Sequence, residues 1–190
     1  MSWVEMLGII GFGLAVVATV LTALQMWMSR PQVKCFFHRQ ELDAGVYLIG
    51  MVGNKPPRRR FQSLGFTRTE PHVVVMLKIF RPGSGTLLSE HIVPLRSPEE
   101  MNATDKLAYR ASLPPSDMMH MFGVVAWPKG ADGAYADIPN SGNPPLRLPE
   151  GTCRIEVEIV ITGVPVKHEA SAIIGKDPAS TKWLAGKNVI

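Results

Sequence analysis

Residues 153–162, CRIEVEIVIT, alternate apolar and polar side chains with a period of two. The apolar positions share one face of an extended chain: Cys153, Ile155, Val157, Ile159 and Ile161. The opposite face carries Arg154, Glu156, Glu158 and Thr162. Alternation of this kind sets one face on a core and the other in water, as in antiparallel sheets. The segment therefore predicts a strand of an antiparallel all-β domain.

Short apolar segments on either side predict further strands at 33–38, 46–52, 72–80, 86–95, 119–127 and 166–174. Residues 81–85, RPGSG, favour a turn, so the strands on each side of them are expected to form a β-hairpin. About seven short strands with proline- and glycine-rich connections predict an antiparallel immunoglobulin-like β-sandwich over residues 29–174. A small β-barrel is the alternative.

Three segments do not follow the strand pattern. Residues 97–112 begin with Ser-Pro-Glu-Glu and predict one short helix. The tail, 175–190, has no strand period and is expected to be mobile or docked. The long connections 53–71 and 129–151 are where binding residues tend to gather on a rigid scaffold.

The chain carries no charge between residues 6 and 28, MLGIIGFGLAVVATVLTALQMWM. A helix of that length is about 34 Å long, enough to cross a hydrocarbon core of about 30 Å. Trp3 and Trp27 lie at its two ends, where tryptophan favours the membrane interface. A cleaved signal peptide is the alternative, but the preceding residues contain no Lys or Arg and the apolar run is long. We therefore expect a single transmembrane helix.

Charges flanking this helix predict its orientation. Glu5 precedes it, whereas Arg30, Lys34 and Arg39 follow, and a second basic cluster comes at 55–60. Basic flanks stay in the cytoplasm, which predicts residues 1–5 outside and the β domain in the cytoplasm, with Arg30 at the interface. Because long domains can be translocated regardless of charge, an outward-facing domain is the alternative.

One face of the helix carries small residues at every fourth position: Gly11, Ala15, Thr19 and Ala23. Small side chains let a second helix approach closely and gain van der Waals contact that lipid does not supply. We expect this face to pack against a copy of itself or against a larger integral membrane protein.

The segment 55–61, KPPRRRF, is the most distinctive polar feature. Lys55, Arg58, Arg59 and Arg60, with Phe61, are expected to contact membrane lipids or an acidic partner protein. Trp183 in the tail is assigned to the same role. Nucleic acid is not expected, because the cluster lacks interleaved aromatic residues and the net charge is only +4.

The residues capable of chemistry do not form a recognisable catalytic or metal-binding set. Cys35 and Cys153 fall in predicted strands and are expected to be buried thiols, or to pair as a disulfide if the domain faces outward. The five histidines lack the spacing of a zinc site, and nucleophile-elbow and phosphate-loop motifs are absent. No enzyme, cofactor or metal is predicted.

The sequence thus predicts a membrane-anchored accessory or scaffold subunit of a larger membrane assembly. Its partners would be lipids and an integral membrane protein complex or a second copy of the helix. The alternative is an outward-facing, membrane-tethered β-sandwich that binds a ligand, or copper at His120 with Met119 or Met121. With 46% hydrophobic and 19% charged residues, a multi-spanning transporter and a disordered chain are excluded.

Overall fold

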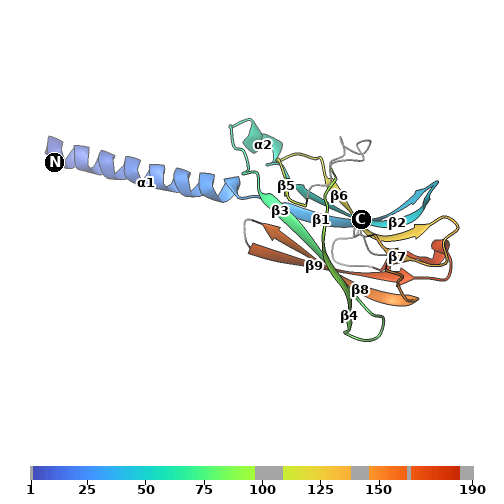
Figure 1. Cartoon of the computed structure of the whole chain (residues 1–190). Helices are drawn as coiled ribbons and strands as arrows, with labels where there is room; N and C mark the ends of the chain where they lie inside the picture. Colours follow the sequence, from blue (N-terminus) through green and yellow to red (C-terminus); the bar gives the residue numbers. More distant parts are fainter. Residues whose placement is uncertain (1, 97–108, 138–145, 162–163, 185–190) are drawn as a thin grey trace.

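The computed structural model describes residues 2–96, 109–137, 146–161 and 164–184. Helix α1 spans Trp3–Ser29 and projects from one end of a β domain (Figure 1). Its 27 residues correspond to about 40 Å. Ser2 caps it: Ser2 Oγ accepts a hydrogen bond from Glu5 N (3.3 Å), and Glu5 Oε2 accepts one from Ser2 N (2.8 Å). The helix therefore contains all of the predicted span, and Glu5 belongs to its first turn.

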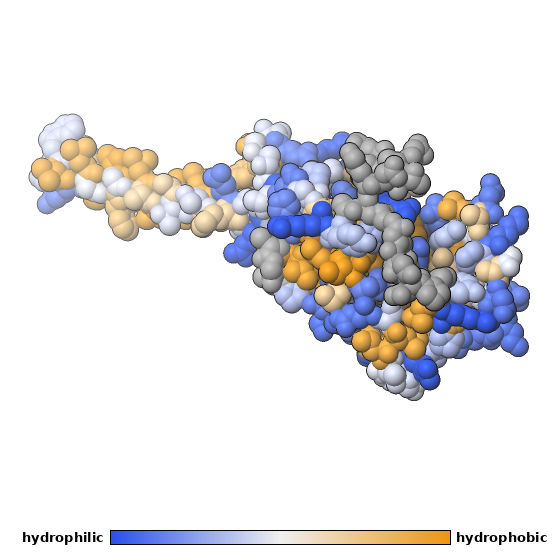
Figure 2. All heavy atoms as spheres, viewed as in Figure 1, coloured by the Kyte–Doolittle hydropathy of each residue, from blue (hydrophilic) through white to orange (hydrophobic). Residues whose placement is uncertain are grey.

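Apolar side chains are exposed around the whole circumference of α1. The consecutive residues Ile9 and Ile10, and also Phe12 and Leu14, all point away from any packed core. Figure 2 shows these apolar side chains along α1, in contrast to the polar residues over much of the visible face of the β domain. A helix that is apolar on every side is stable only when buried in protein or lipid. By length and composition α1 can span a membrane.

The β domain consists of two antiparallel sheets. The four-stranded sheet has the order β1-β2-β6-β7, formed by β1 (Val33–Leu42), β2 (Gly45–Asn54), β6 (His120–Pro128) and β7 (Tyr135–Ala136). The six-stranded sheet has the order β10-β9-β8-β3-β4, formed by β10 (Lys182–Leu184), β9 (Val164–Ile174), β8 (Gly151–Ile161), β3 (His72–Phe80) and β4 (Leu87–Val93). Its sixth strand, β5 (Ala111–Ser112), pairs with β3.

Both sheets contribute to one hydrophobic core. Phe37, Leu48 and Phe122 from the four-stranded sheet are buried in the same cluster as Leu77 and Ile155 from the other. This two-layer arrangement is compatible with the predicted β-sandwich. The β-hairpin predicted around residues 81–85 is confirmed, because β3 and β4 pair antiparallel.

Strand β8 has the predicted alternation, with Cys153, Ile155, Val157 and Ile159 buried. Its polar face is not simply solvated. Glu156 pairs with Lys167 on β9 (3.0 Å), and Glu158 pairs with Lys78 on β3 (3.5 Å). Ion pairs across neighbouring strands therefore line the outer face of this sheet.

Cys35 and Cys153 are both buried and free, each on a different sheet. Burial raises the pKa of the Cys35 thiol to about 12 and that of Cys153 to about 11. The disulfide considered for an outward-facing domain is not formed, and both thiols pack as small apolar side chains.

Two segments without a strand pattern in the sequence contain short strands in the structure. Residues 97–108 of the predicted short helix lie outside the described residues, and Ala111 and Ser112 at its end form strand β5. The tail forms a 3₁₀ turn, Pro178–Ser180, followed by β10, which pairs with β9. The described part of the tail is therefore docked on the domain.

Candidate functional site

The end of α1 is fixed to the β domain. Only residues 30–32 separate α1 from β1. The carbonyl oxygen of Ser29 accepts hydrogen bonds from Thr69 N (2.8 Å) and Thr69 Oγ1 (2.9 Å). The last carbonyls of a helix lack partners within the helix, so Thr69 acts as a cap supplied by the domain. Met28, in the last turn, is buried.

Asn54, at the end of β2, connects this cap to the core. The side chain is fully buried, and its Oδ1 accepts a hydrogen bond from Gln32 N (3.0 Å). Its Nδ2 donates to Thr69 O (3.0 Å) and to Leu113 O (3.2 Å). One amide thus joins the connection after α1, the Thr69 segment and the Leu113 segment. Thr69 receives a bond from Asn54 and donates to Ser29, so the helix end is linked directly to the core.

The basic segment 55–61 continues into a compact loop beside this junction, as Figure 1 shows for α2 (Arg59–Gln62). Gln62 Nε2 donates a hydrogen bond to Pro57 O (2.9 Å), and Phe66 N donates one to Phe61 O (3.0 Å). The rings of Phe61 and Phe66 meet edge to face with their centroids 6.3 Å apart. Phe61 is 38% exposed and Leu64 is 70% exposed. The loop therefore presents apolar side chains outward beside its arginines.

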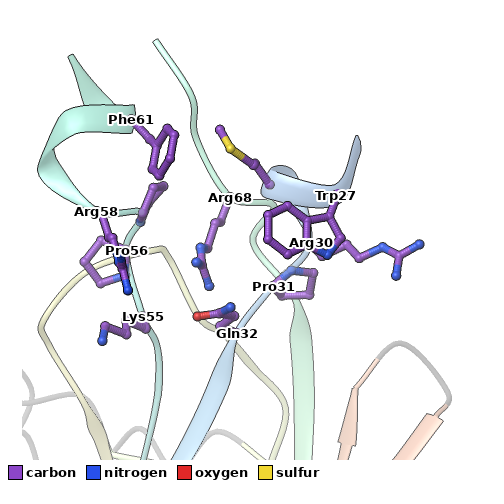
Figure 3. A pocket seen from close by; sticks show the side chains of 11 residues that line it. Trp27, Arg30, Pro31, Gln32, Lys55, Pro56, Arg58, Phe61 and Arg68 are labelled. Carbon is purple, nitrogen blue, oxygen red and sulfur yellow. The ribbon is translucent and has the colours of Figure 1, made fainter. Parts of the chain in front are cut away.

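A pocket of about 650 Å³ lies between the last turn of α1 and this loop. Its cationic residues are Arg30, Lys55, Arg58 and Arg68, and its apolar wall includes Trp27, Met28 and Phe61. In Figure 3, Arg68 reaches into the middle of the pocket between Phe61 and Trp27, with Gln32 and Lys55 beneath it. None of the described lining residues carries a carboxylate.

Arg68 is the most unusual side chain in this pocket. Its Nε and Nη1 atoms are buried and have no hydrogen-bond partner among the described residues. Burial lowers the pKa of the Arg68 guanidinium from its usual range, because no counter-ion compensates for lost hydration. Glu70, two residues further along the chain, accepts a hydrogen bond from Ser112 Oγ and does not line the pocket. Within the described part of the chain, no ion pair includes a cation of this pocket.

The structure gathers part of the predicted site at this pocket and leaves part elsewhere. Lys55, Arg58, Phe61, Arg30 and Trp27 all line it. Four other residues predicted to lie at the membrane interface or to contact lipid or a partner are outside its lining. Arg59 and Arg60 are exposed on α2, and Trp3 is exposed at the far end of α1. Trp183 lies on β10, where its ring packs 4.8 Å from that of Phe37.

Along α1, the predicted packing residues Gly11, Ala15, Thr19 and Ala23 are all exposed. Thr19 Oγ1 donates a hydrogen bond to Ala15 O (2.8 Å), so its hydroxyl is already satisfied within the helix. A Cβ added at Gly11 would meet nothing within 4 Å. This face is therefore open to a second helix.

Arg68 was missed by the sequence analysis. The only available signal was its place in the long connection 53–71, because nothing in the local sequence Thr67-Arg68-Thr69 distinguishes it from a solvated surface arginine. Arg68 stands out only in the fold, where the end of α1, the loop 55–61 and the segment that contains Arg68 line one pocket.

The metal alternative places copper at His120 with Met119 or Met121. His120 begins β6 and Met121 follows it in the strand, where successive side chains alternate between the two faces, whereas Met119 precedes the strand. Among the residues that the structure describes, no group of three or more His, Cys, Asp or Glu side chains could hold a metal ion.

Comparisons of this chain with protein-family models, with curated proteins and with solved structures find no match. Inference about function therefore rests on the chemistry of α1, the junction and the basic pocket.

Proposed function

We propose that this protein is a single-pass, membrane-anchored accessory or scaffold subunit of a larger membrane assembly. The observation that carries the proposal is α1, a helix of 27 residues that is apolar on every side and is not covered by the β domain. The docking mechanism has two parts. The helix packs against a partner within the bilayer, and the β domain is held against the membrane surface by the fixed junction.

The distribution of charge supports a cytoplasmic β domain. Glu5 is the acidic residue of the first turn of α1, whereas cationic side chains collect around its last turn. Arg30, Lys55 and Arg58 lie at the membrane-proximal end of the domain as neighbours in space, although two of them are distant from α1 in sequence. Positive charge at one end of a membrane helix favours retention of that end in the cytoplasm.

Strand order supports an immunoglobulin-like fold for the β domain. Immunoglobulin domains have strands A, B and E in one sheet and strands C, F and G in the other. Here β1, β2 and β6 are neighbours in one sheet, and β9, β8, β3 and β4 are neighbours in the other. Assigned in chain order, β1, β2, β3, β6, β8 and β9 correspond to A, B, C, E, F and G, and β4 takes the place of C′. This fold provides a rigid body with edge strands, and it implies no activity by itself.

The helix-packing part of the proposal is tested with a matched pair of variants. Gly11 lies on the small-residue face, whereas Gly13 is rotated from it by about 200° around the helix. A Cβ at either position meets nothing within 4 Å in the single chain. Gly11→Leu is therefore expected to reduce the size of the complex extracted in mild detergent, and Gly13→Leu is expected to leave it unchanged. Elution of the wild-type chain as a free monomer would contradict the proposal.

Orientation is tested separately with a reporter. An alkaline-phosphatase fusion after residue 190 is expected to be inactive in a bacterial host, because this enzyme requires an oxidising compartment for its disulfides. A fusion to a cytoplasmic fluorescent reporter at the same site is expected to be fluorescent. High phosphatase activity would place the domain outside and favour the outward-facing alternative.

A further inference from the structure

We infer that the pocket between α1 and the basic loop binds the phosphate group of an anionic phospholipid, whose acyl chains lie along α1 in the membrane. This inference rests on the proposed anchoring of α1 in a bilayer, and it assigns to the pocket a ligand class and a binding residue, Arg68.

The charges that line the pocket favour an anionic ligand. Arg30, Lys55, Arg58 and Arg68 line one hollow, and none of them has a carboxylate partner among the described residues. Arg30, Lys55 and Arg58 are exposed to water, whereas two donors of Arg68 are buried, and an anion in the pocket would offset the repulsion among these four cations. The guanidinium fork of arginine matches two oxygens of a phosphate, and a buried Nε–H and Nη1–H without partners are the donors that such a ligand would use.

The apolar lining of the pocket favours a ligand that is amphiphilic. Trp27 and Met28 of the last helical turn, together with Phe61, form an apolar wall beside the cations. In Figure 3 the side chain of Arg68 extends into this pocket between Phe61 and the ring of Trp27. An apolar wall contributes nothing to the binding of a small hydrated anion such as free phosphate. It does accommodate the glycerol and the first methylenes of a lipid.

The location of the pocket places it at the level of the headgroups. The uncharged stretch 6–28 is about 34 Å long, so Trp27 and Met28 lie at the boundary of a hydrocarbon core of about 30 Å. Arg68 and Lys55 lie just beyond this boundary because they line the same pocket as Trp27 and Met28. Phosphates of the adjacent leaflet occupy this layer. In the cytoplasmic orientation that leaflet is the one rich in anionic lipid.

The test uses the full-length chain in detergent with lipid added, and native mass spectrometry measures the fraction with bound lipid. The probes are dioleoyl phosphatidylglycerol, which is anionic, and dioleoyl phosphatidylcholine, which has no net charge. The wild-type chain is expected to retain phosphatidylglycerol preferentially. Arg68→Gln is expected to weaken this retention by about tenfold, the effect of one charge-assisted hydrogen bond.

Two further variants keep the result interpretable. Arg81→Gln removes an exposed arginine in the turn after β3, outside the pocket lining, and is expected to change nothing. Arg58→Gln changes an exposed residue of the loop and is expected to weaken phosphatidylglycerol binding without affecting folding. This variant therefore still tests the pocket if Arg68→Gln is unstable. Equal retention of the two lipids, or equal losses in Arg68→Gln and Arg81→Gln, would overturn the inference.

Two controls separate the remaining explanations. Displacement of phosphatidylglycerol by millimolar inorganic phosphate would assign the pocket to a soluble anion and would also overturn the inference. A carbonate wash of native membranes reports on anchoring alone: wild type and Arg68→Gln are both expected to stay in the membrane, because α1 holds them there. Release of both chains by carbonate would refute the proposed anchoring, whereas retention with no lipid preference would refute only the lipid site.

Discussion

Replacing Asn54 with alanine removes the amide that links the end of α1 to the core. Three hydrogen bonds end on this side chain: one from Gln32 N (3.0 Å), one to Thr69 O (3.0 Å) and one to Leu113 O (3.2 Å). At about 1 kcal/mol each, their loss lowers the free energy of unfolding by about 3 kcal/mol. In a domain of this size that corresponds to a fall in melting temperature of about 10 °C. The Asn54 side chain is fully buried, and its hydrogen bond to Leu113 O is buried as well.

Asn54→Asp sharpens this prediction because it keeps the shape and changes only the hydrogen bonding. One carboxylate oxygen can still accept from Gln32 N, but the other faces two carbonyl oxygens that previously received the amide NH₂. At neutral pH, Asn54→Asp should therefore be less stable than Asn54→Ala. Burial raises the pKa of the introduced carboxyl above about 3.9, so the folded state binds its proton more readily than the unfolded state. The deficit relative to wild type should shrink as the pH falls through that raised pKa.

Thermal unfolding of the full-length chain in detergent, at pH 7.5 and at pH 5, measures both effects as differences from wild type at the same pH. Hydrogen exchange adds a local readout, because the amide of Gln32 should lose protection in Asn54→Ala. If Asn54→Ala melts within experimental error of wild type, the amide does not support the junction. If Asn54→Asp is the more stable of the two variants at pH 7.5, the assigned orientation of the amide is wrong.

Three further predictions concern the β domain. A Cβ at Gly50 would lie 2.1 Å from the ring of Phe122, so Gly50→Ala should destabilise the fold by about 1–3 kcal/mol. A Cβ at Gly85 would have nothing within 4 Å, so Gly85→Ala should leave the stability unchanged, and denaturant unfolding compares the two variants. Because burial raises the pKa of Cys35 from 9.0 to about 12, its thiolate fraction at pH 8 falls by about three orders of magnitude, and maleimide should label it only after unfolding. Burial lowers the pKa of His91, so below about pH 6.5 protons bind preferentially to the unfolded chain. The melting temperature should therefore fall as the pH drops from 7.5 to 5.5, and it should fall less in His91→Gln.

Elements with a long, regular pattern could be predicted from the sequence. In the sequence, apolar and polar residues alternate from Cys153 to Ile159 in β8, and the uncharged run 6–28 lies within α1. The short strands β5, β7 and β10 could not be predicted, because two or three residues contain no measurable period. Their positions depend on pairing with β3, β6 and β9.

Trp183 shows why local composition misleads in such segments. In the sequence it is a lone aromatic residue among lysines and turn formers, which indicates an exposed contact residue. In the structure, pairing of Lys182–Leu184 with β9 places its ring against Phe37 of β1. The contact joins residues separated by most of the length of the β domain. No local pattern encodes such a contact.

In the candidate site, too, residues in a local sequence pattern could be predicted and residues brought together only by the fold could not. Lys55, Arg58 and Phe61 could be predicted because they form one short basic segment. Arg68 could not, because its significance lies in the absence of a partner for its buried donors. That absence depends on how the end of α1 and the basic loop are placed around Arg68 in the fold. A partly buried arginine with two buried, unpartnered donors is a property of the fold, and only indirectly a property of the sequence.

The fixed junction connects α1 to the pocket that we propose as a lipid site. Three residues of connection span at most about 11 Å, and the Thr69 cap and Asn54 network hold even this short segment in place. If α1 spans the bilayer, the domain therefore cannot leave the membrane surface, and the loop that shares a pocket with Trp27 must lie within the headgroup layer. The exposed side chains of Phe61 and Leu64 then face lipid, and the neighbouring arginines face phosphates. The apolar and cationic residues of this loop are thus both explained by one position of the domain.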